Sequence, residues 1–176
     1  QNHRRLDAES IRDAMLSIRG HLETKPPASS PVAKLVGVNI GRETSQLQQA
    51  SGTDFRHRSV YLPILRNALP EVLAVFDFAE PSIIVGRRQI TTVPSQALFM
   101  MNSDFVVAQS DALAKRLLQN ENLDHDQRIR RAYRLTLCRA PSADELAKTK
   151  QFLGTFAGEA DKPTAEAYSA FCQAPL

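Results

Sequence analysis

The chain has 176 residues, of which 43% are hydrophobic and 23% are charged, and its formal net charge is +3. This composition is typical of a globular domain and excludes an intrinsically disordered chain. No apolar run approaches the roughly 20 residues that cross a bilayer, so we predict no membrane span. The small net charge, the sparse aromatics and the absence of Trp argue against a nucleic-acid partner.

The start of the chain and its two cysteines give further expectations. The sequence begins at Gln1 without an initiator Met or an apolar leader, and we expect it to be a piece of a longer protein. Cys138 and Cys172 are too far apart in the sequence for a CxxC redox pair or a zinc half-site. We expect two buried thiols, with a disulfide in an oxidising compartment as the alternative.

The first third of the chain predicts one amphipathic helix. Apolar residues recur at helical spacing from about Leu6 to Arg19, and Gly20 is typical of a left-handed helix end. Residues 32–40 fit a short helix and a short strand equally well. The polar residues 42–54 are expected to be exposed.

Polar and apolar residues are most closely mixed between Arg56 and Asn102. Within this segment the patterns predict an extended piece over residues 58–63, a short helix over residues 67–76 and an extended stretch over residues 83–85. Thr92 followed by Pro94 predicts the start of a helix that runs to about Met101.

The last third predicts four amphipathic helices, each preceded by a polar cap residue. The predicted caps are Ser103, Asp124 with Gln127, Ser142 with Glu145, and Thr164. We therefore predict a mainly α protein with little or no sheet. In this prediction residues 1–176 form a single compact helical domain, with four or five helices packed around the irregular central segment.

Sequence motifs for known chemistries are missing. There is no GxxxxGK[ST], GxGxxG, GxSxG, HExxH or CxxCH pattern, and the four histidines lie far apart in the sequence. We accordingly expect no cofactor and no metal site in this chain. His57 is the one histidine weighed as a catalytic group, and a structural role is the favoured reading for it.

The positive signal is the group of polar side chains in the central segment. A buried guanidinium needs a carboxylate or several carbonyl groups, and Asp77 lies between Phe76 and Phe78. We predict that the Asp77 carboxylate is substantially buried and accepts a hydrogen bond from at least one of four arginines. These four are Arg58, Arg66, Arg87 and Arg88.

The full candidate set has two interpretations. It forms either a structural polar centre or a pocket for an anion beside a helix start, where free backbone N–H groups favour negative charge. The set comprises Arg58, Arg66, Asp77, Arg87, Arg88, Thr91, Thr92, Gln96 and Asn102.

Several motifs together carry a resemblance to a known family. They are RHRSVYLP (56–63), FD (76–77), GRR (86–88), TTVPSQAL (91–98) and MN (101–102), with LDAESIRDAML (6–16) and YRLTLCRAPSADEL (133–146). These motifs resemble the planctomycete-specific domain of unknown function, although His57 stands where that pattern has a second Arg. The resemblance implies the C-terminal domain of a large exported, cytochrome-c-associated bacterial protein. It therefore implies a periplasmic or secreted location, but no activity.

From these observations we expect a non-catalytic interaction module, which docks other domains of the parent protein or an extracytoplasmic partner. A polysaccharide is an alternative partner. The rival hypothesis is an enzyme or redox-accessory domain that uses the Arg/Asp/Thr centre on an anionic substrate, of which a carbohydrate derivative is one candidate. The two hypotheses differ in whether Arg87, Arg88 and Gln96 line an open concavity or are sealed inside.

Overall fold

The protein is described by a computed structural model, which covers residues 5–30, 55–64, 69–157 and 164–174. These parts contain seven α-helices, one 3-10 helix and no strand, where four or five helices were expected. The prediction of a mainly α protein is confirmed for the described residues. None of their helices combines the length and the apolar character that a bilayer span requires.

The described residues form two compact units. The first consists of Gln1–Ser17 and His21–Phe99, and the second of Ile18–Gly20 and Met100–Leu176. The prediction that residues 1–176 are a single domain stays a prediction.

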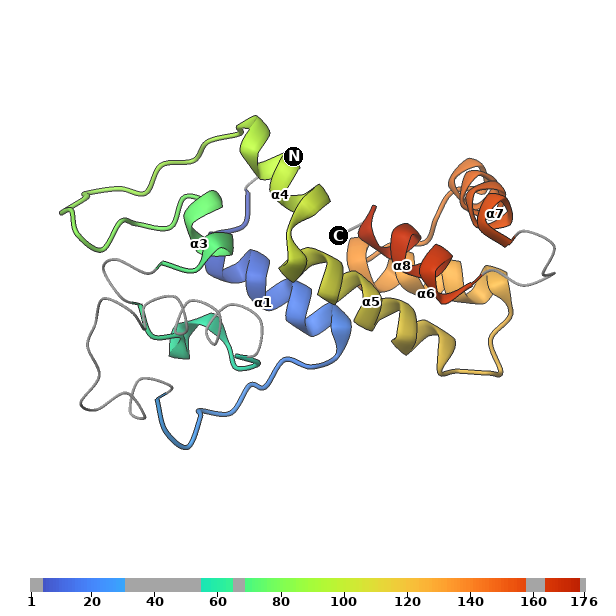
Figure 1. Ribbon diagram of the computed structural model, residues 1–176, viewed down its shortest axis with the longest axis horizontal. Coiled ribbons are helices and arrows are strands. Elements are labelled where there is room, and N and C mark those ends of the chain that lie inside the picture. Colours follow the sequence, from blue (N-terminus) through green and yellow to red (C-terminus); the bar gives the residue numbers. More distant parts are fainter. Residues whose placement is uncertain (1–4, 31–54, 65–68, 158–163, 175–176) are drawn as a thin grey trace. The chain divides into compact units, whose positions relative to one another are not determined.

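The second unit is built mainly from four helices (Figure 1), namely α5 (Asp104–Leu118), α6 (His125–Leu137), α7 (Ala143–Ala157) and α8 (Ala165–Gln173). Helix α8 packs against α5 and α7, and α6 also contacts both of these helices. Their shared core includes Leu113, Leu117, Ile129 and Tyr168, all completely buried. Burying a Leu or Ile side chain contributes about 1.5–3 kcal/mol, so this core is the main source of stability in the unit.

All four predicted helix caps of this unit are confirmed. The capping side chains accept hydrogen bonds from backbone N–H groups of the first helical turn, at Ser103, Asp124, Ser142 and Thr164. At Asp124 and Ser142 the Gln or Glu three residues later also accepts from the cap residue's own N–H, which completes a capping box.

Glu145 makes the start of α7 sensitive to acid. Its carboxylate accepts from both terminal nitrogens of Arg139, at 2.8 and 2.6 Å, and from the N–H of Ser142 at 2.7 Å. The bonds from Arg139, followed by the Ser142 N–H, lower the pKa of Glu145 from its ordinary value of 4.5 to about 2. Because the pKa is depressed in the folded state, this stabilisation is present above pH 4.5 and is lost as the pH falls towards 2.

We predict that Glu145→Gln lowers the melting temperature at neutral pH and flattens its decrease in acid. Thermal melts of both proteins across this pH range measure the effect. Identical acid profiles for the variant and the parent protein would show that Glu145 does not contribute.

The two cysteines differ in exposure. Cys172 is completely buried on α8, whereas Cys138 is exposed and follows α6 in a left-handed conformation with φ 54°. Both are free thiols, so the prediction of two buried thiols is confirmed for Cys172 and wrong for Cys138. Burial raises the pKa of Cys172 to about 12.

We predict that a maleimide at neutral pH alkylates Cys138 in the folded protein and reaches Cys172 only after unfolding, because the thiolate is the reactive species. Peptide mass mapping with and without urea measures both sites. Equal labelling of the two thiols in the native state would contradict the packing of α8.

The first unit is held together around α1 (Ala8–Arg19). As predicted, this helix stops at Gly20, whose φ of +84° is left-handed. Its buried face carries Ala8, Met15 and Leu16, but Leu6, which was expected to belong to the helix, precedes it and is exposed.

Three short helices accompany α1. They are the 3-10 helix η2 (Ser59–Tyr61), α3 (Glu71–Val75) and α4 (Pro94–Asn102), whose last three residues belong to the second unit. The prediction of an extended piece over residues 58–63 is therefore wrong at η2. The predictions for residues 32–40 and 42–54 lie outside the described residues.

Candidate functional site

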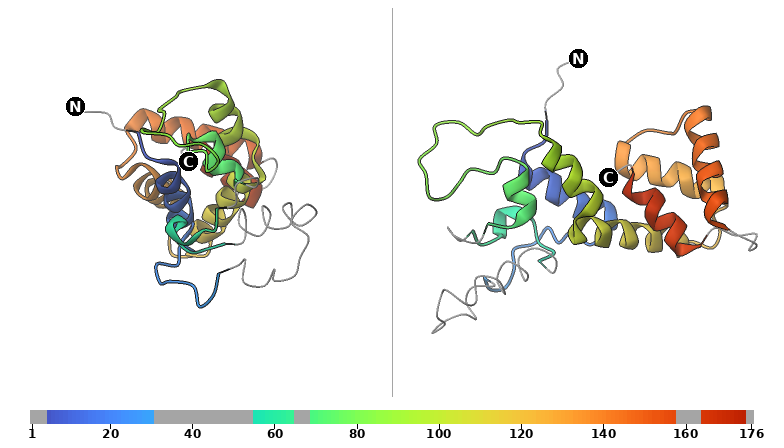
Figure 2. Two further views of the ribbon diagram at one scale, coloured as in Figure 1. Left: turned by 90° about the vertical axis from the view of Figure 1, so that its left-hand side faces the viewer. Right: turned by 45° about the horizontal axis from the view of Figure 1, so that its top comes forward.

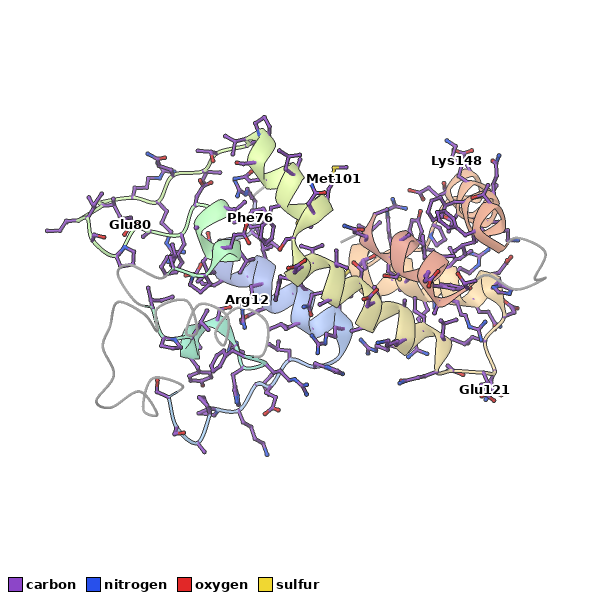
Figure 3. The ribbon with its side chains drawn as sticks, viewed as in Figure 1. Arg12, Phe76, Glu80, Met101, Glu121 and Lys148 are labelled. Carbon is purple, nitrogen blue, oxygen red and sulfur yellow. The ribbon has the colours of Figure 1, made fainter. Side chains whose placement is uncertain are left out.

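Arg12 is completely buried on the inner face of α1 (Figure 3). Its Nη1 donates to the His57 carbonyl and the Ser59 Oγ, both at 3.2 Å, and its Nη2 donates to the Phe55 carbonyl. The guanidinium also lies over the Phe55 ring, 5.8 Å from the centroid. Burial lowers the pKa of Arg12 to about 10, so the side chain is charged at neutral pH. Arg12 thus fastens residues 55–59 to α1.

Asp13 completes this attachment on the same helix. Its Oδ1 accepts from the backbone N–H of Ser59 at 2.8 Å and from the Ser59 hydroxyl at 2.6 Å. Arg58 lies 3.8 Å from the Asp13 Oδ2, so this candidate residue belongs to the attachment of η2. His57 is also engaged structurally, with its Nδ1 2.9 Å from the Lys25 carbonyl oxygen.

Asp77 is the centre of a second polar cluster. The Thr91 N–H donates to its Oδ2 at 2.8 Å and the Thr91 hydroxyl donates to its Oδ1 at 2.8 Å. Arg5 pairs with Oδ2 at 3.1 Å, and its guanidinium lies over the Phe76 ring. Partial burial raises the pKa of Asp77, but the Thr91 hydrogen bonds and Arg5 outweigh this effect, and the net shift is downward.

The predicted partner of Asp77 is therefore wrong for the described residues. The carboxylate is 17% exposed and its arginine is Arg5, which lies 72 positions away in the sequence. Arg58, Arg87 and Arg88 form no hydrogen bond or ion pair with it in the described part of the chain, and Arg66 lies outside that part.

Gln96 ties the two ends of the loop between α3 and α4. Its Nε2 donates to the Val75 carbonyl at 3.0 Å, and its Oε1 accepts from the Val93 N–H at 3.4 Å. The side chain is only 8% exposed. Helix α4 begins at Pro94, so Val93 is the residue before it. The helix therefore starts one residue later than a cap at Thr92 predicts.

Above these clusters lies an open pocket of about 650 Å³, bounded by the residues before and at the start of α1 and by the loop that follows α3. Its charged lining residues are Arg5, Asp7, Asp77, Arg87 and Arg88. Both positive and negative groups thus line the pocket. The pocket is therefore suited to a ligand with several hydrogen-bonding groups rather than to an apolar one.

The two neighbouring arginines of the pocket differ in their partners. Arg88 forms a bidentate pair with Glu9, with both N–O distances 2.7 Å, and its guanidinium lies 4.9 Å from the centre of the Phe78 ring. This pair raises the pKa of Arg88 and lowers that of Glu9. Arg87 is exposed and has no ionic or hydrogen-bond partner among the described residues. It is the pocket cation that remains available to a ligand.

The structure thus divides the candidate set. Arg87 and Arg88 line the open pocket with Asp77 and Thr92, whereas Gln96 is buried and does not line it. Asn102 is exposed at the end of α4 in the second unit. Of the three residues chosen to distinguish the two hypotheses, Arg87 and Arg88 line an open concavity and Gln96 does not.

Sequence reasoning missed the four α1-side residues that hold the first unit together, Arg5, Glu9, Arg12 and Asp13. A signal for Arg12 was present, because helical spacing places it on the face of Ala8 and Met15. No equivalent local signal exists for Arg5.

Across the described ranges, no three His, Cys, Asp or Glu side chains come close enough to hold a metal ion.

Among the described residues of the first unit, residues 82–90 form a continuous exposed stretch, which we call the arm. It lies in the loop that leaves α3, runs away from the helices and returns to α4 (Figures 1 and 2). Figure 3 shows Phe76 at the foot of this loop and Glu80 farther along it. Every residue of the arm is exposed, including the aliphatic Ile83, Ile84, Val85 and Ile90.

A family model described as "PSD1: Protein of unknown function (DUF1553)" matches residues 1–153. The chain belongs to this family. The resemblance inferred from the motifs is confirmed at this level, that of a domain of unknown function. No curated protein and no solved structure matches the chain.

Proposed function

We propose that this domain is a non-catalytic interaction module of an extracytoplasmic multidomain protein, and that it docks its partner through the arm. The observation that carries the proposal is the exposure of four aliphatic side chains within nine consecutive exposed residues. Contiguous exposed apolar surface is typical of a protein interaction site. The partner is another domain of the parent protein or a separate extracytoplasmic protein.

The polar clusters support this choice over catalysis. Both oxygens of Asp77 and the amide of Gln96 are occupied by internal hydrogen bonds, and the guanidinium of Arg12 is completely buried. Groups engaged in this way hold the loop and η2 in place. They leave little capacity for proton transfer to a substrate, because a catalytic base needs a free lone pair within reach of the reacting group.

The extracytoplasmic location and the association with cytochrome-c-like regions enter the proposal from the motif resemblance. In that arrangement the domain contributes a docking surface and the redox chemistry belongs to other regions of the parent protein.

Site-specific photo-crosslinking tests the docking function. We expect Ile84→p-benzoylphenylalanine, placed in the full-length protein in its native host, to capture one discrete protein segment. The matched control carries the same photoreactive residue at Glu121, an exposed loop position of the second unit. If position 84 captures no more protein than position 121, the docking function is wrong.

A second candidate function rests on the 650 Å³ pocket and the unpartnered Arg87. In this alternative the domain is an enzyme or redox-accessory domain acting on an anionic substrate, such as a sugar acid. A thermal-shift screen with phosphate, sulfate and glucuronate tests it, because a ligand that binds the folded state raises the melting temperature.

The control variants for this screen remove one exposed arginine each. Arg87→Ala should abolish a stabilisation that Arg130→Ala, on α6 in the second unit, leaves intact. If no anion stabilises the protein, or if both variants respond alike, the pocket has no such substrate.

A further inference from the structure

We infer that the arm docks by strand pairing, taking an extended segment of a partner protein as its neighbouring strand. This inference rests on the proposed docking function and names its mode. It follows from three properties of the arm: its backbone, the faces of its aliphatic residues and its charge.

The backbone of the arm has free hydrogen-bonding groups. From Ile84 to Ile90, no N–H or C=O group bonds another residue in the described part of the chain. At the foot of the loop, by contrast, the Thr91 N–H is engaged with Asp77. A run of unpaired N–H and C=O groups is what a sheet edge presents to an added strand. The arm therefore offers a partner main-chain hydrogen bonds.

The aliphatic residues of the arm require cover on two sides. Ile83, Ile84 and Val85 are consecutive and are 63%, 102% and 47% exposed. In an extended chain they point alternately to opposite faces. Consecutive β-branched residues are typical of strands that are covered on both faces. The partner must therefore supply both a strand and a layer that packs over it.

These requirements exclude two other occupants. A lipid surface could cover the aliphatic side chains, but its hydrocarbon offers no hydrogen-bond partner to the backbone. Two copies of the arm could pair with each other, but an isolated two-stranded ribbon leaves both faces in water and is marginally stable.

Charge adds a requirement for the partner sequence. Arg87 follows the aliphatic residues and has no partner among the described residues, whereas Arg88 is held by Glu9. A partner strand that places a carboxylate opposite Arg87 gains a cross-strand pair, worth roughly 0.2–1 kcal/mol. We therefore expect the docked segment to be aliphatic with an acidic residue at this position.

Two single proline substitutions, at adjacent positions, test strand pairing in the full-length protein. The photoreactive residue stays at position 84, and Val85→Pro and Gly86→Pro are made separately. Successive N–H groups of a strand point in opposite directions, so a partner on one edge bonds only every second residue, and Pro removes that donor. Val85→Ala and Gly86→Ala are the controls, and a Cβ at Gly86 has no atom within 4 Å.

We expect one proline variant to lose capture about tenfold and the other to stay within about twofold of its alanine control. If both prolines or neither reduce capture, strand pairing is wrong although docking holds. Capture of lipid, or of a second arm, also overturns the inference. If position 84 captures nothing, the proposed function fails first, so the two failures are distinguishable.

Discussion

Arg12→Met is expected to lower the free energy of unfolding by about 3–5 kcal/mol, enough to unfold a marginal domain. Met fills much of the same volume but donates no hydrogen bond. The carbonyl groups of Phe55 and His57 and the hydroxyl of Ser59 then lose a charged donor in the interior. Each buried acceptor left unsatisfied costs about 1–3 kcal/mol, which makes lost hydrogen bonding the main term.

Urea unfolding followed by circular dichroism measures this effect, with Arg58→Met as the matched control. Arg58 is 55% exposed and its nearest carboxylate oxygen is 3.8 Å away, so its loss should cost no more than about 1 kcal/mol. Equal midpoints for the two variants would show that Arg12 does not hold residues 55–59 to α1.

Asp77→Ala is expected to cost about 2–3 kcal/mol, since hydrogen bonds to a charged group contribute about 1.5–3 kcal/mol each and this carboxylate is partly exposed. The Thr91 N–H and hydroxyl and the Arg5 guanidinium all lose their acceptor. Backbone geometry adds to the effect. Asp77 has a φ of 63°, which Asp and Asn adopt more readily than Ala does.

Asp77→Asn should therefore cost about half as much as Asp77→Ala, because it keeps one acceptor oxygen and the tolerance for a left-handed backbone. Asp7→Ala is the control. Asp7 lines the same pocket, but its carboxylate has no hydrogen-bond partner among the described residues. If Asp77→Ala and Asp7→Ala have equal melting temperatures, the Asp77 cluster does not stabilise the loop.

The helices of the second unit could be predicted because their signals are local. Asp124 with Gln127 and Ser142 with Glu145 form capping boxes from residues three apart, and such contacts form whatever the rest of the chain does. The buried positions Tyr168 and Phe171 follow from helical spacing in the same way.

The partner of Asp77 could not be predicted, because Arg5 reaches Asp77 only through the tertiary fold. Arg5 is 72 positions away, and no pattern near Asp77 distinguishes it from the four nearer arginines that were expected. At η2 a tertiary contact decided the local structure. Asp13 accepts from the Ser59 N–H and hydroxyl, and this outweighs the weak alternation that favoured an extended piece.

Ile83, Ile84 and Val85 are exposed, although their sequence pattern is typical of buried residues. A short β-branched run normally predicts a buried strand. In this domain the run is exposed, so its apolar character has no explanation within the described residues. Local rules fail most often at functional sites, and this is why docking is assigned to the arm.

Hydrogen exchange at residues 82–90 in the full-length protein, isolated in its native assembly, tests the docking claim most directly. We expect these amides to exchange at least about tenfold more slowly than those of an unstructured chain, because the partner covers the arm and bonds every second N–H group. The exposed residues Glu121 and Asn122 serve as the internal reference for fast exchange. Exchange of the arm as fast as at Glu121 and Asn122 would contradict docking through the arm.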